Sequence, residues 1–317
     1  MSTGTISGYP IYMPFYKYVA SSATVSATTT AAGSSITITA SDSSFSTQQV
    51  NDIIRIGGRQ VLLTAVASAT SASGIIKHEL SSTSATDDWD EQAFSTYRGW
   101  PICPEFFPDR LVFFGAKSRP SGLWMSKIGA YFNFDVGAAA DDDAIWEGIA
   151  GARARYACGS RFLVLFGDRD FYYIPTSASN PLPPANFSVV KQQPYGCAQV
   201  RPRLFDEAFL FVQHTGSVVR EALWEDALQS HAATPISLLA PHLVSGGSTY
   251  SAPTGLAVLY GRQASPEQYA LLLASSGQLS IFHSVREEKL AAWVPWETTG
   301  TIKQVFDIDT EVFTFVE

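Results

Sequence analysis

The chain has 317 residues, of which 46% are hydrophobic and only 16% are charged, and 21 Lys and Arg against 29 Asp and Glu give a net charge of −8 at pH 7. This length exceeds the usual size of one simple domain, so we expect two folding units or one large repeat architecture. Tight binding of nucleic acid is disfavoured, because it needs clustered Lys and Arg and the sequence contains no basic run.

The first two segments differ in composition. Residues 1–20 are rich in aromatic residues and proline, and we expect a lead-in or an edge segment of the propeller described below, without a completed hairpin. Residues 21–97 are rich in Ser and Thr, but apolar and hydroxyl residues alternate there with the period of two that is typical of strands. A small β-barrel or sandwich domain is therefore predicted over residues 21–97. Its strands are expected at residues 35–40, 50–56, 59–66 and 75–80.

Residues 98–317 contain apolar strands that return at intervals of roughly 40 to 60 residues. Four of these strands are each followed by a glycine-bearing turn and an aromatic-rich strand, which is the pattern of a β-hairpin. Units of this length with four strands each are typical of β-propeller blades. No convincing helix competes, because the best candidate, residues 221–239, is interrupted at Thr234-Pro235. The predicted hairpins are residues 111–114 with 123–126, 162–166 with 170–175, 209–212 with 218–223, and 269–273 with 279–282.

The predicted fold is therefore all-β: a partial β-propeller of four-stranded blades with a small inserted β-barrel or sandwich domain. The last apolar run, residues 311–317, has no turn and no partner strand after it. An open propeller edge leaves backbone groups unpaired, which is costly. We therefore expect that residues 98–317 form blades that are incomplete at the C-terminus, and that the chain is an excerpt of a longer protein.

Two acidic clusters are the sharpest polar features of the sequence. Asp141-Asp142-Asp143 suggests a Ca²⁺ or Mg²⁺ site. However, consecutive residues of an extended segment point to opposite faces, and the EF-hand spacing is absent, so we expect a solvated loop or a capping turn before Ala144. In residues 87–91 we expect Trp89 to be packed and the carboxylates to be exposed.

Histidine and cysteine residues form no recognisable site. No two histidines have the i, i+4 spacing of a helical metal pair, and no two cysteines form a CxxC pair. We expect buried free thiols and neither a disulfide framework nor a zinc site. The residues concerned are His78, His214, His231, His242 and His283, and Cys103, Cys158 and Cys197.

Motifs for nucleophilic catalysis and phosphate binding are also missing. Gly159-Ser160-Arg161 lacks the GxSxG pattern, and the glycine turns at residues 57–58, 167–168 and 246–247 lack GxGxxG or GKS/T. A sialidase-like propeller needs several arginines, a tyrosine nucleophile and carboxylates. Candidates for these arginines and this tyrosine are Arg110, Arg155, Arg161 and Tyr172. No catalytic, cofactor-binding or metal-ligating residue is assigned, and no cofactor is expected.

Two aromatic stripes remain to be explained, Phe171-Tyr172-Tyr173 and Trp293-Val294-Pro295-Trp296. They suggest either a sugar-binding platform or core packing. Propeller blades bury such residues between neighbouring sheets, so core packing is favoured.

The sequence predicts no membrane segment. The longest apolar runs, such as residues 209–212 and 271–274, fall far short of the roughly 18 residues that cross a bilayer. The first residues also lack the basic and apolar regions of a secretory signal. We therefore expect a soluble protein made in the cytosol.

A series of short motifs runs in order through nearly all of residues 20–317. They are residues 36–41 with Phe45, 50–56, 63–66, Arg98-Gly99-Trp100-Pro101, 110–115, 123–126, 132–134, 141–145, 189–193, 210–213, 238–243, 277–279 and 286–293. Together they resemble the tail nozzle, or hub-like, structural proteins of short-tailed phages (podovirus-type) and related prophages. Residues 36–66 also look like a small β domain similar to the first catalytic cysteine half-domain of ubiquitin-activating enzymes. This similarity implies shape only, and no ubiquitin chemistry follows because the segment contains no Cys.

The resemblance implies a virion structural protein of the tail, made in the host cytoplasm and without enzymatic activity. It implies a homo-oligomeric ring, commonly a hexamer, with a portal or adaptor ring and tail fibre or spike proteins as partners. The ring conducts the genome and seals it until ejection, so DNA passes with weak, non-specific contact. An acidic, Lys-poor wall suits this role because it does not trap phosphates. The alternative is a carbohydrate-binding or glycosidase β-propeller acting on the host surface, which no interpretable pair of carboxylates supports.

Overall fold

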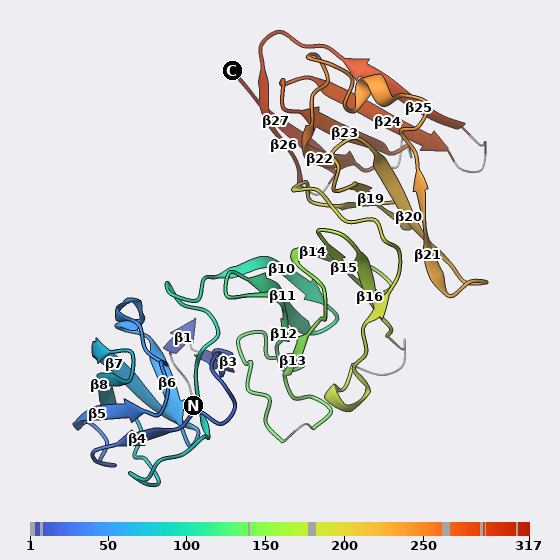
Figure 1. The fold of residues 1–317 in the computed structure, drawn as a ribbon. Helices are drawn as coiled ribbons and strands as arrows, with labels where there is room; N and C mark the ends of the chain where they lie inside the picture. Colours follow the sequence, from blue (N-terminus) through green and yellow to red (C-terminus); the bar gives the residue numbers. More distant parts are fainter. Residues whose placement is uncertain are drawn as a thin grey trace. The chain divides into compact units, whose positions relative to one another are not determined.

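The computed structural model describes residues 4–6, 9–138, 140–176, 182–261, 267–285, 288, 290–308 and 310–317. Over these residues the chain forms β-strands and no α-helix (Figure 1). The fold is all-β, with four-stranded antiparallel sheets in the manner of a partial β-propeller, as the sequence predicts. Three short 3-10 turns are η1 (Thr47–Gln49), η2 (Pro184–Asn186) and η3 (Pro241–Leu243).

The chain divides into two compact units, and each is described by itself. Unit 1 holds the small β domain and most of the first propeller sheet, and unit 2 holds the later sheets. Unit 1 comprises Met1–Ile102, Pro108–Gly148 and Pro181–Asn186, and unit 2 comprises Cys103–Phe107, Ile149–Asn180 and Phe187–Glu317.

The small β domain of unit 1 is a seven-stranded sheet in the order β3-β9-β6-β7-β8-β5-β4. Every second residue of β5 is buried, so Ile36 and Ile38 enter a core with Ile54 and Leu63. The strand expected at residues 75–80 begins and ends earlier, because the preceding small residues pair with β5 and β7. The strands are β3 (Phe15–Tyr16), β4 (Val25–Ala27), β5 (Ser35–Ala40), β6 (Ile53–Ile56), β7 (Arg59–Ser68), β8 (Ser71–Ile76) and β9 (Trp89–Gln92).

The first residues form a hairpin, so the expectation that they complete no hairpin was wrong. β1 (Gly4–Ile6) pairs antiparallel with β2 (Tyr9–Ile11), and neither pairs with a third strand in the described part of the chain. Tyr12 then anchors the chain: its N–H donates to the carbonyl of Phe132 (2.9 Å), and its carbonyl accepts from the N–H of Phe134 (2.9 Å). The hairpin therefore directly precedes a fixed point of unit 1.

The first propeller sheet has the strand order β10-β11-β12-β13. Its predicted central hairpin is confirmed, with Phe113 opposite Trp124. Phe94, Trp124 and Phe134 belong to the apolar core of this part of unit 1. The strands are β10 (Pro101–Phe107), β11 (Arg110–Ala116), β12 (Arg119–Met125) and β13 (Ile145–Gly148).

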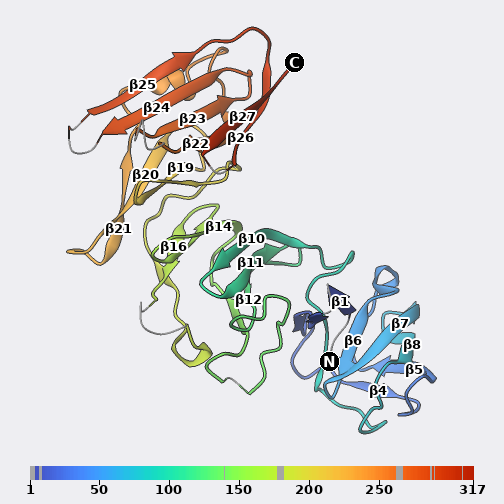
Figure 2. The ribbon, with the colours of Figure 1, turned by 180° about the vertical axis from the view of Figure 1, so that it is seen from behind.

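Unit 2 contains three four-stranded antiparallel sheets whose strands follow one another in chain order (Figures 1 and 2). Each predicted hairpin supplies the second and third strands of its sheet, which confirms the four-stranded repeat. The first sheet is β14 (Ala154–Gly159), β15 (Leu163–Gly167), β16 (Phe171–Ile174) and β17 (Val190–Lys191). The second is β18 (Arg203–Phe205), β19 (Ala208–Val212), β20 (Val219–Glu225) and β21 (Ser230–Pro235). The third is β22 (Pro253–Leu259), β23 (Tyr269–Ala274), β24 (Leu279–Val285) and β25 (Leu290–Trp296).

These sheets pack face to face through apolar side chains, as propeller blades do. Phe166 and Phe171 of the first sheet contact Phe211 of the second, with ring centroids 5.2 and 5.8 Å apart. Phe205 of the second sheet contacts Phe282 of the third at 5.8 Å. Because the middle strands are covered on both faces, β15 and β19 are buried along their whole length.

A two-stranded hairpin follows the third sheet. β26 (Ile302–Ile308) pairs antiparallel with β27 (Glu311–Val316), and no further strand in the described residues joins them. Ile302 and Val305 pack on the third sheet. β26 was not predicted from the sequence, and it gives the last apolar strand a partner that precedes it, while no described strand follows. Its place after β26 makes β27 the equivalent of the second strand of a blade.

Candidate functional site

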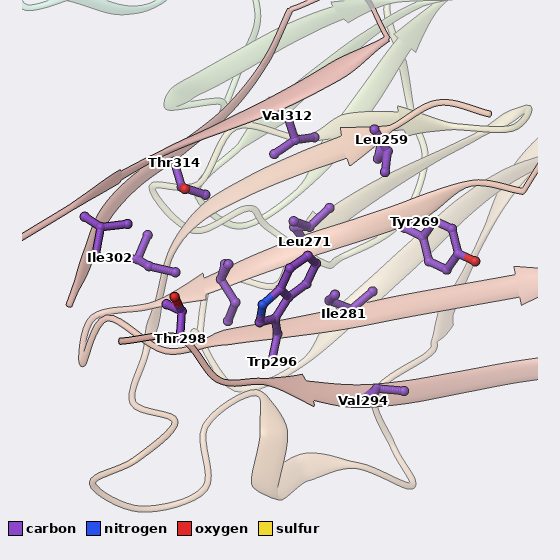
Figure 3. Close-up of a pocket in the computed structure, with 12 residues that line it drawn as sticks. Leu259, Tyr269, Leu271, Ile281, Val294, Trp296, Thr298, Ile302, Val312 and Thr314 are labelled. Atoms are coloured by element: carbon purple, nitrogen blue, oxygen red, sulfur yellow. The ribbon is translucent and has the colours of Figure 1, made fainter. Parts of the chain in front are cut away.

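A cavity of about 630 Å³ lies in unit 2 between the third sheet (β22–β25) and the C-terminal hairpin (β26–β27). Side chains of the hairpin and of the sheet face one another across it, and the Trp296 ring extends into it (Figure 3). The lining is almost entirely apolar and includes no charged side chain. It consists of Leu259, Tyr269, Leu271, Leu279, Ile281, Val294, Trp296, Thr298, Ile302, Val312, Thr314 and Val316.

Alternation and register bring these residues together. On β23, Leu271 points to the cavity side, whereas Ala270 and Leu272 point into the core shared with the second sheet. Leu271 lies opposite Ile281 on β24, and Ile281 lies opposite Val294 on β25. One apolar row therefore crosses the sheet from its second strand to its fourth.

The hairpin covers only half of this face of the sheet. Leu271 on the second strand is buried, whereas Val294 and Trp296 on the fourth strand are 52% and 50% exposed. On the opposite face of the same strand, Trp293 packs on the core shared with the second sheet and donates its Nε1–H to the carbonyl of Ile236 (2.9 Å). The two faces of β25 differ in exposure because a four-stranded sheet covers one face and a two-stranded hairpin covers the other.

A second, more polar hollow of about 410 Å³ adjoins the cavity and shares Leu259, Tyr269 and Val312 with it. Its lining also includes Glu267 and Glu311. The Tyr269 hydroxyl donates to Glu267 Oε2 (2.5 Å), and this hydrogen bond is the main cause that raises the tyrosine pKa. The cavity and the adjoining hollow together form one groove, with an apolar body in the cavity and an acidic end in the hollow.

The cavity offers few polar groups to a ligand. Its lining contributes the hydroxyls of Tyr269, Thr298 and Thr314 and the Trp296 N–H. Exposed apolar surface of this kind is typical of an interaction surface or a ligand-binding groove. In the sequence Trp296 stands out only as part of an aromatic stripe, and no local pattern predicts the cavity.

The acidic stretch at residues 141–143 lies in unit 1 and contains a capping turn. The Asp143 carboxylate is buried, accepts from the N–H of Ala140 (2.8 Å) and pairs with the Lys127 ammonium. The hydrogen bond from Lys127 is the first cause that holds the Asp143 pKa below its usual range. Asp141 and Asp142 are exposed. A capping turn therefore describes Asp143, and a solvated loop describes its two neighbours.

Arg110 is buried, and among the described residues its hydrogen bonds go to backbone carbonyls. Its Nη1 donates to Ser126 (2.5 Å) and Asp143 (2.7 Å), and its Nη2 donates to Leu182 (2.9 Å) and Asp141 (3.3 Å). Burial lowers the pKa of this guanidinium. These contacts give Arg110 a structural role, in which it ties the acidic loop to β11 and β12.

The other residues considered for a sialidase-like site stay apart. Arg161 pairs at the surface with Asp226 (3.0 Å), and Tyr172 is buried within the first sheet of unit 2, where it lies opposite Leu165. No contact among the described residues brings Arg155 to either of them. Core packing is confirmed for the stripe at residues 171–173, which is buried. The stripe at residues 293–296 divides, with Trp293 on the core and Trp296 at the cavity.

The expectation for residues 87–91 was right in part. Trp89 is buried, and Asp87 and Asp88 are exposed. Glu91, however, is buried, because the period of two along β9 places it on the same face as Trp89. Arg98 compensates its charge, with Nη2 2.6 Å from Glu91 Oε1.

The five histidines do not cluster in one site. His231 is buried among aromatic rings, with centroids 5.0 Å from Trp224 and 5.8 Å from Tyr173. Burial lowers its pKa to about 4, so the imidazole is neutral. His283 stacks on Tyr269 at 4.7 Å. The others, His78, His214 and His242, are exposed or half-buried.

The three cysteines are free and buried, as predicted. Among the described residues, no group of three or more His, Cys, Asp or Glu side chains gathers to hold a metal ion. No helix in that part of the chain has the length and apolarity needed to span a membrane. Gly57, Gly58 and Gly247 have φ of +56°, +71° and +81°, as turns require. Of the motif residues, Arg286, Glu287 and Lys289 lie outside the described residues.

Comparison with known proteins yields weak structural similarities only. No family model and no curated protein matches the chain. An auxiliary nutrient binding protein from Bacteroides thetaiotaomicron aligns over 91% of this chain and 70% of its own, at 8% identity and a TM-score of 0.36. Its counterpart from Bacteroides ovatus aligns over 84% and 67%, at 7% identity and a TM-score of 0.36. BBS1N, solved in complex with ARL6DN, aligns over 89% and 82%, at 10% identity and a TM-score of 0.41.

Proposed function

We propose that this chain is a structural subunit of a phage tail nozzle, part of a ring that conducts and seals the genome channel, and not an enzyme. The observation that carries the proposal is the two-stranded hairpin β26–β27, which leaves an apolar cavity open over the third sheet. Uncovered apolar surface and unpaired strand edges are costly unless another segment covers them. Such a surface is expected of a subunit that completes itself by assembly.

Two features of the sequence support the nozzle in particular. The motifs within residues 20–317 resemble nozzle proteins in order and spacing. The net charge of −8 disfavours tight DNA binding, which is what a channel wall needs if DNA is to slide past it. The partners proposed with this role are further copies in a ring, a portal or adaptor ring, and tail fibre or spike proteins.

One observation favours the carbohydrate alternative. The half-exposed Trp296 and, elsewhere in the lining, Tyr269 offer aromatic surfaces of the kind on which sugars stack. Sugar hydroxyls also need several polar partners, and the main cavity supplies few. The nozzle proposal is therefore preferred.

The test combines DNA binding with assembly. A gel-shift assay with duplex DNA at physiological salt is expected to show binding weaker than micromolar, without sequence preference. Sedimentation with purified phage particles that carry portal and adaptor rings but lack the nozzle is expected to bring the chain down with the particles. Tighter DNA binding together with no co-sedimentation would overturn the proposal. Release of sugar from host-surface glycans would favour the alternative.

A further inference from the structure

The outer edge of β27 carries backbone groups that β26 does not use. Glu317 and Thr301 exchange two backbone hydrogen bonds of 2.8 and 2.9 Å, which fixes the phase of the ladder. Backbone groups of antiparallel strands alternate in direction, so those of Thr314 and Val316 point away from β26. No strand in the described part of the chain pairs with that edge.

Two further strands on this edge would complete a blade. In the three sheets of unit 2 the strands follow in chain order, with the fourth outermost. β26 and β27 hold the first two positions, and the third and fourth positions fall over β24 and β25. Ile281, Val294 and Trp296 line the cavity there. The cavity therefore has the position and the apolar character that two added strands require.

A second copy of the same C-terminal hairpin does not fit this position. If β27 paired antiparallel with β27 of a second copy, the two hairpins would be related by a two-fold axis perpendicular to the sheet. The faces that pack on the third sheet would then lie on the same side in both copies. The β22–β25 sheets of the two copies would then compete for one space, because β24 and β25 already extend over it. The added strands must bring no covering sheet on that face.

We propose that the N-terminal hairpin of a second copy, β1–β2, adds to β27 and completes this blade, with β1 beside β27 and β2 outermost. The hairpin has two strands, the number that the blade lacks, and neither pairs with a third strand in the described residues. It is antiparallel, as every blade is. This is strand addition at a sheet edge, in which backbone hydrogen bonds supply much of the affinity.

Pro10 fixes which strand of the hairpin is outermost. Pro10 of β2 lies opposite Thr5 of β1 and has no N–H to donate. Within a sheet, proline is found at an edge, with its nitrogen directed away from the partner strand. The free edge of β2 therefore lacks a donor and is protected against further pairing, and β1 offers the competent edge.

The charges of the two surfaces are compatible. The acidic end of the groove includes Glu267 and Glu311. The first 41 residues of the chain contain no Asp or Glu, and Asp42 is the first carboxylate in the sequence. The N-terminal segment therefore brings no negative charge into an acidic hollow. Its apolar residues Ile6, Tyr9 and Ile11 match the apolar body of the cavity in type.

Such an exchange is head to tail, because it joins β1 of one copy to β27 of the next. Interfaces of this kind close into rings when the rotation between copies allows it. The inference deepens the proposed ring and rests on that proposal only for the ring itself. Strand addition is testable with purified chains alone.

Two variants separate the donor from the acceptor. Deletion of residues 1–11 removes the donor hairpin and keeps the β27 edge. Thr314→Pro removes one N–H of the free edge, and that N–H takes no part in the ladder with β26. Thr314→Ala is the matched control, because it removes the same side chain and keeps the N–H. Circular dichroism and thermal unfolding establish that each variant is folded.

Sedimentation velocity then gives the result. Each variant alone is expected to lose self-association, and their mixture is expected to form a 1:1 heterodimer that grows no further. The Thr314→Ala chain is expected to associate as the unmodified chain does. A mixture of folded variants that stays monomeric would overturn the proposal. So would an unmodified chain that stays monomeric because its own hairpin has added to its own β27.

Hydrogen exchange provides a second measurement if Thr314→Pro perturbs the hairpin. In the unmodified chain, the amides of Thr314 and Val316 are expected to gain protection as protein concentration rises. Protection that does not change with concentration would count against addition by a second copy. If strand exchange is not observed, co-sedimentation with phage particles still tests the nozzle role. The two proposals can therefore fail independently.

Discussion

The guanidinium of Arg98 holds the carboxylate of Glu91 with two hydrogen bonds, Nε to Oε2 at 2.9 Å and Nη2 to Oε1 at 2.6 Å. Glu91 lies on β9, and Arg98 lies in the turn between β9 and β10, so the pair fixes the chain where it leaves the small β domain. Arg98 also lies over the ring of Tyr18 at 4.1 Å. Burial raises the pKa of Glu91, and Arg98 opposes that effect.

Glu91→Gln is therefore expected to lower the free energy of unfolding by about 3 kcal/mol, because it leaves the largely buried Arg98 charge without the carboxylate that it hydrogen-bonds. Asp90→Asn is the matched control. Asp90 pairs with Arg55 where both side chains are more exposed, and its loss is expected to cost about 1 kcal/mol or less. Urea unfolding of both variants measures the difference, and equal costs would contradict the prediction.

The acidic stretch of unit 1 gives a second prediction. Asp143→Ala removes the partner of Lys127 and the acceptor of the Ala140 N–H, so we expect a loss of about 2 kcal/mol in stability. Asp141→Ala and Asp142→Ala are expected to change stability by about 0.5 kcal/mol at most, because both side chains are exposed. Chemical denaturation with the three variants side by side decides this. Equal effects at all three positions would show that the cap does not stabilise the loop.

The buried thiols give a third prediction. Burial raises the pKa of Cys103, Cys158 and Cys197, and the thiolate is the reactive form. In the folded protein at pH 8, a soluble disulfide reagent is expected to label none of the three at an appreciable rate. In denaturant all three are expected to react quickly. Rapid labelling of one cysteine in the native state would show that its blade opens locally.

The parts of the fold that the sequence predicted are those with a strong local signal. The run of apolar residues at 209–212, its glycine turn and the strand after it identify the middle of a blade without any knowledge of the neighbours. β26 was missed because Lys303, Gln304 and Asp307 interrupt its apolar pattern. Asp307 Oδ1 instead lies 3.1 Å from Nε of Arg203 on β18, a partner that no local pattern reveals.

The candidate site was beyond the reach of local patterns. The cavity is lined from six strands, and its existence depends on how many strands cover Val294 and Trp296, not on any motif. Burial of Glu91 was missed for a related reason. An acidic cluster suggests exposed carboxylates, but strand alternation turned Glu91 inward and Arg98 made its burial tolerable.

His231 gives the last prediction, a dependence of stability on pH. Its folded-state pKa of about 4 lies below the ordinary value of 6.5, because burial disfavours the charged form. Well above pH 6.5 the imidazole is neutral in the folded and the unfolded chain and does not lower the free energy of unfolding. Below pH 6.5 the unfolded chain binds a proton that the folded chain refuses, so stability falls until the pH reaches about 4 and then levels off. The full loss is about 3 kcal/mol.

Carboxylates also titrate near the lower end of this range, so the measurement must isolate the histidine. His231→Phe keeps an aromatic ring beside Trp224 and Tyr173 and removes the titrating group. The difference in unfolding free energy between the unmodified chain and this variant is expected to change by about 3 kcal/mol between pH 7 and pH 4, in favour of the variant at low pH. Gln192 Oε1 lies 3.3 Å from His231 Nδ1 and loses that contact in the variant, which shifts the difference by a constant and leaves its slope intact. A difference that is flat with pH would mean that the aromatic cluster admits the imidazolium.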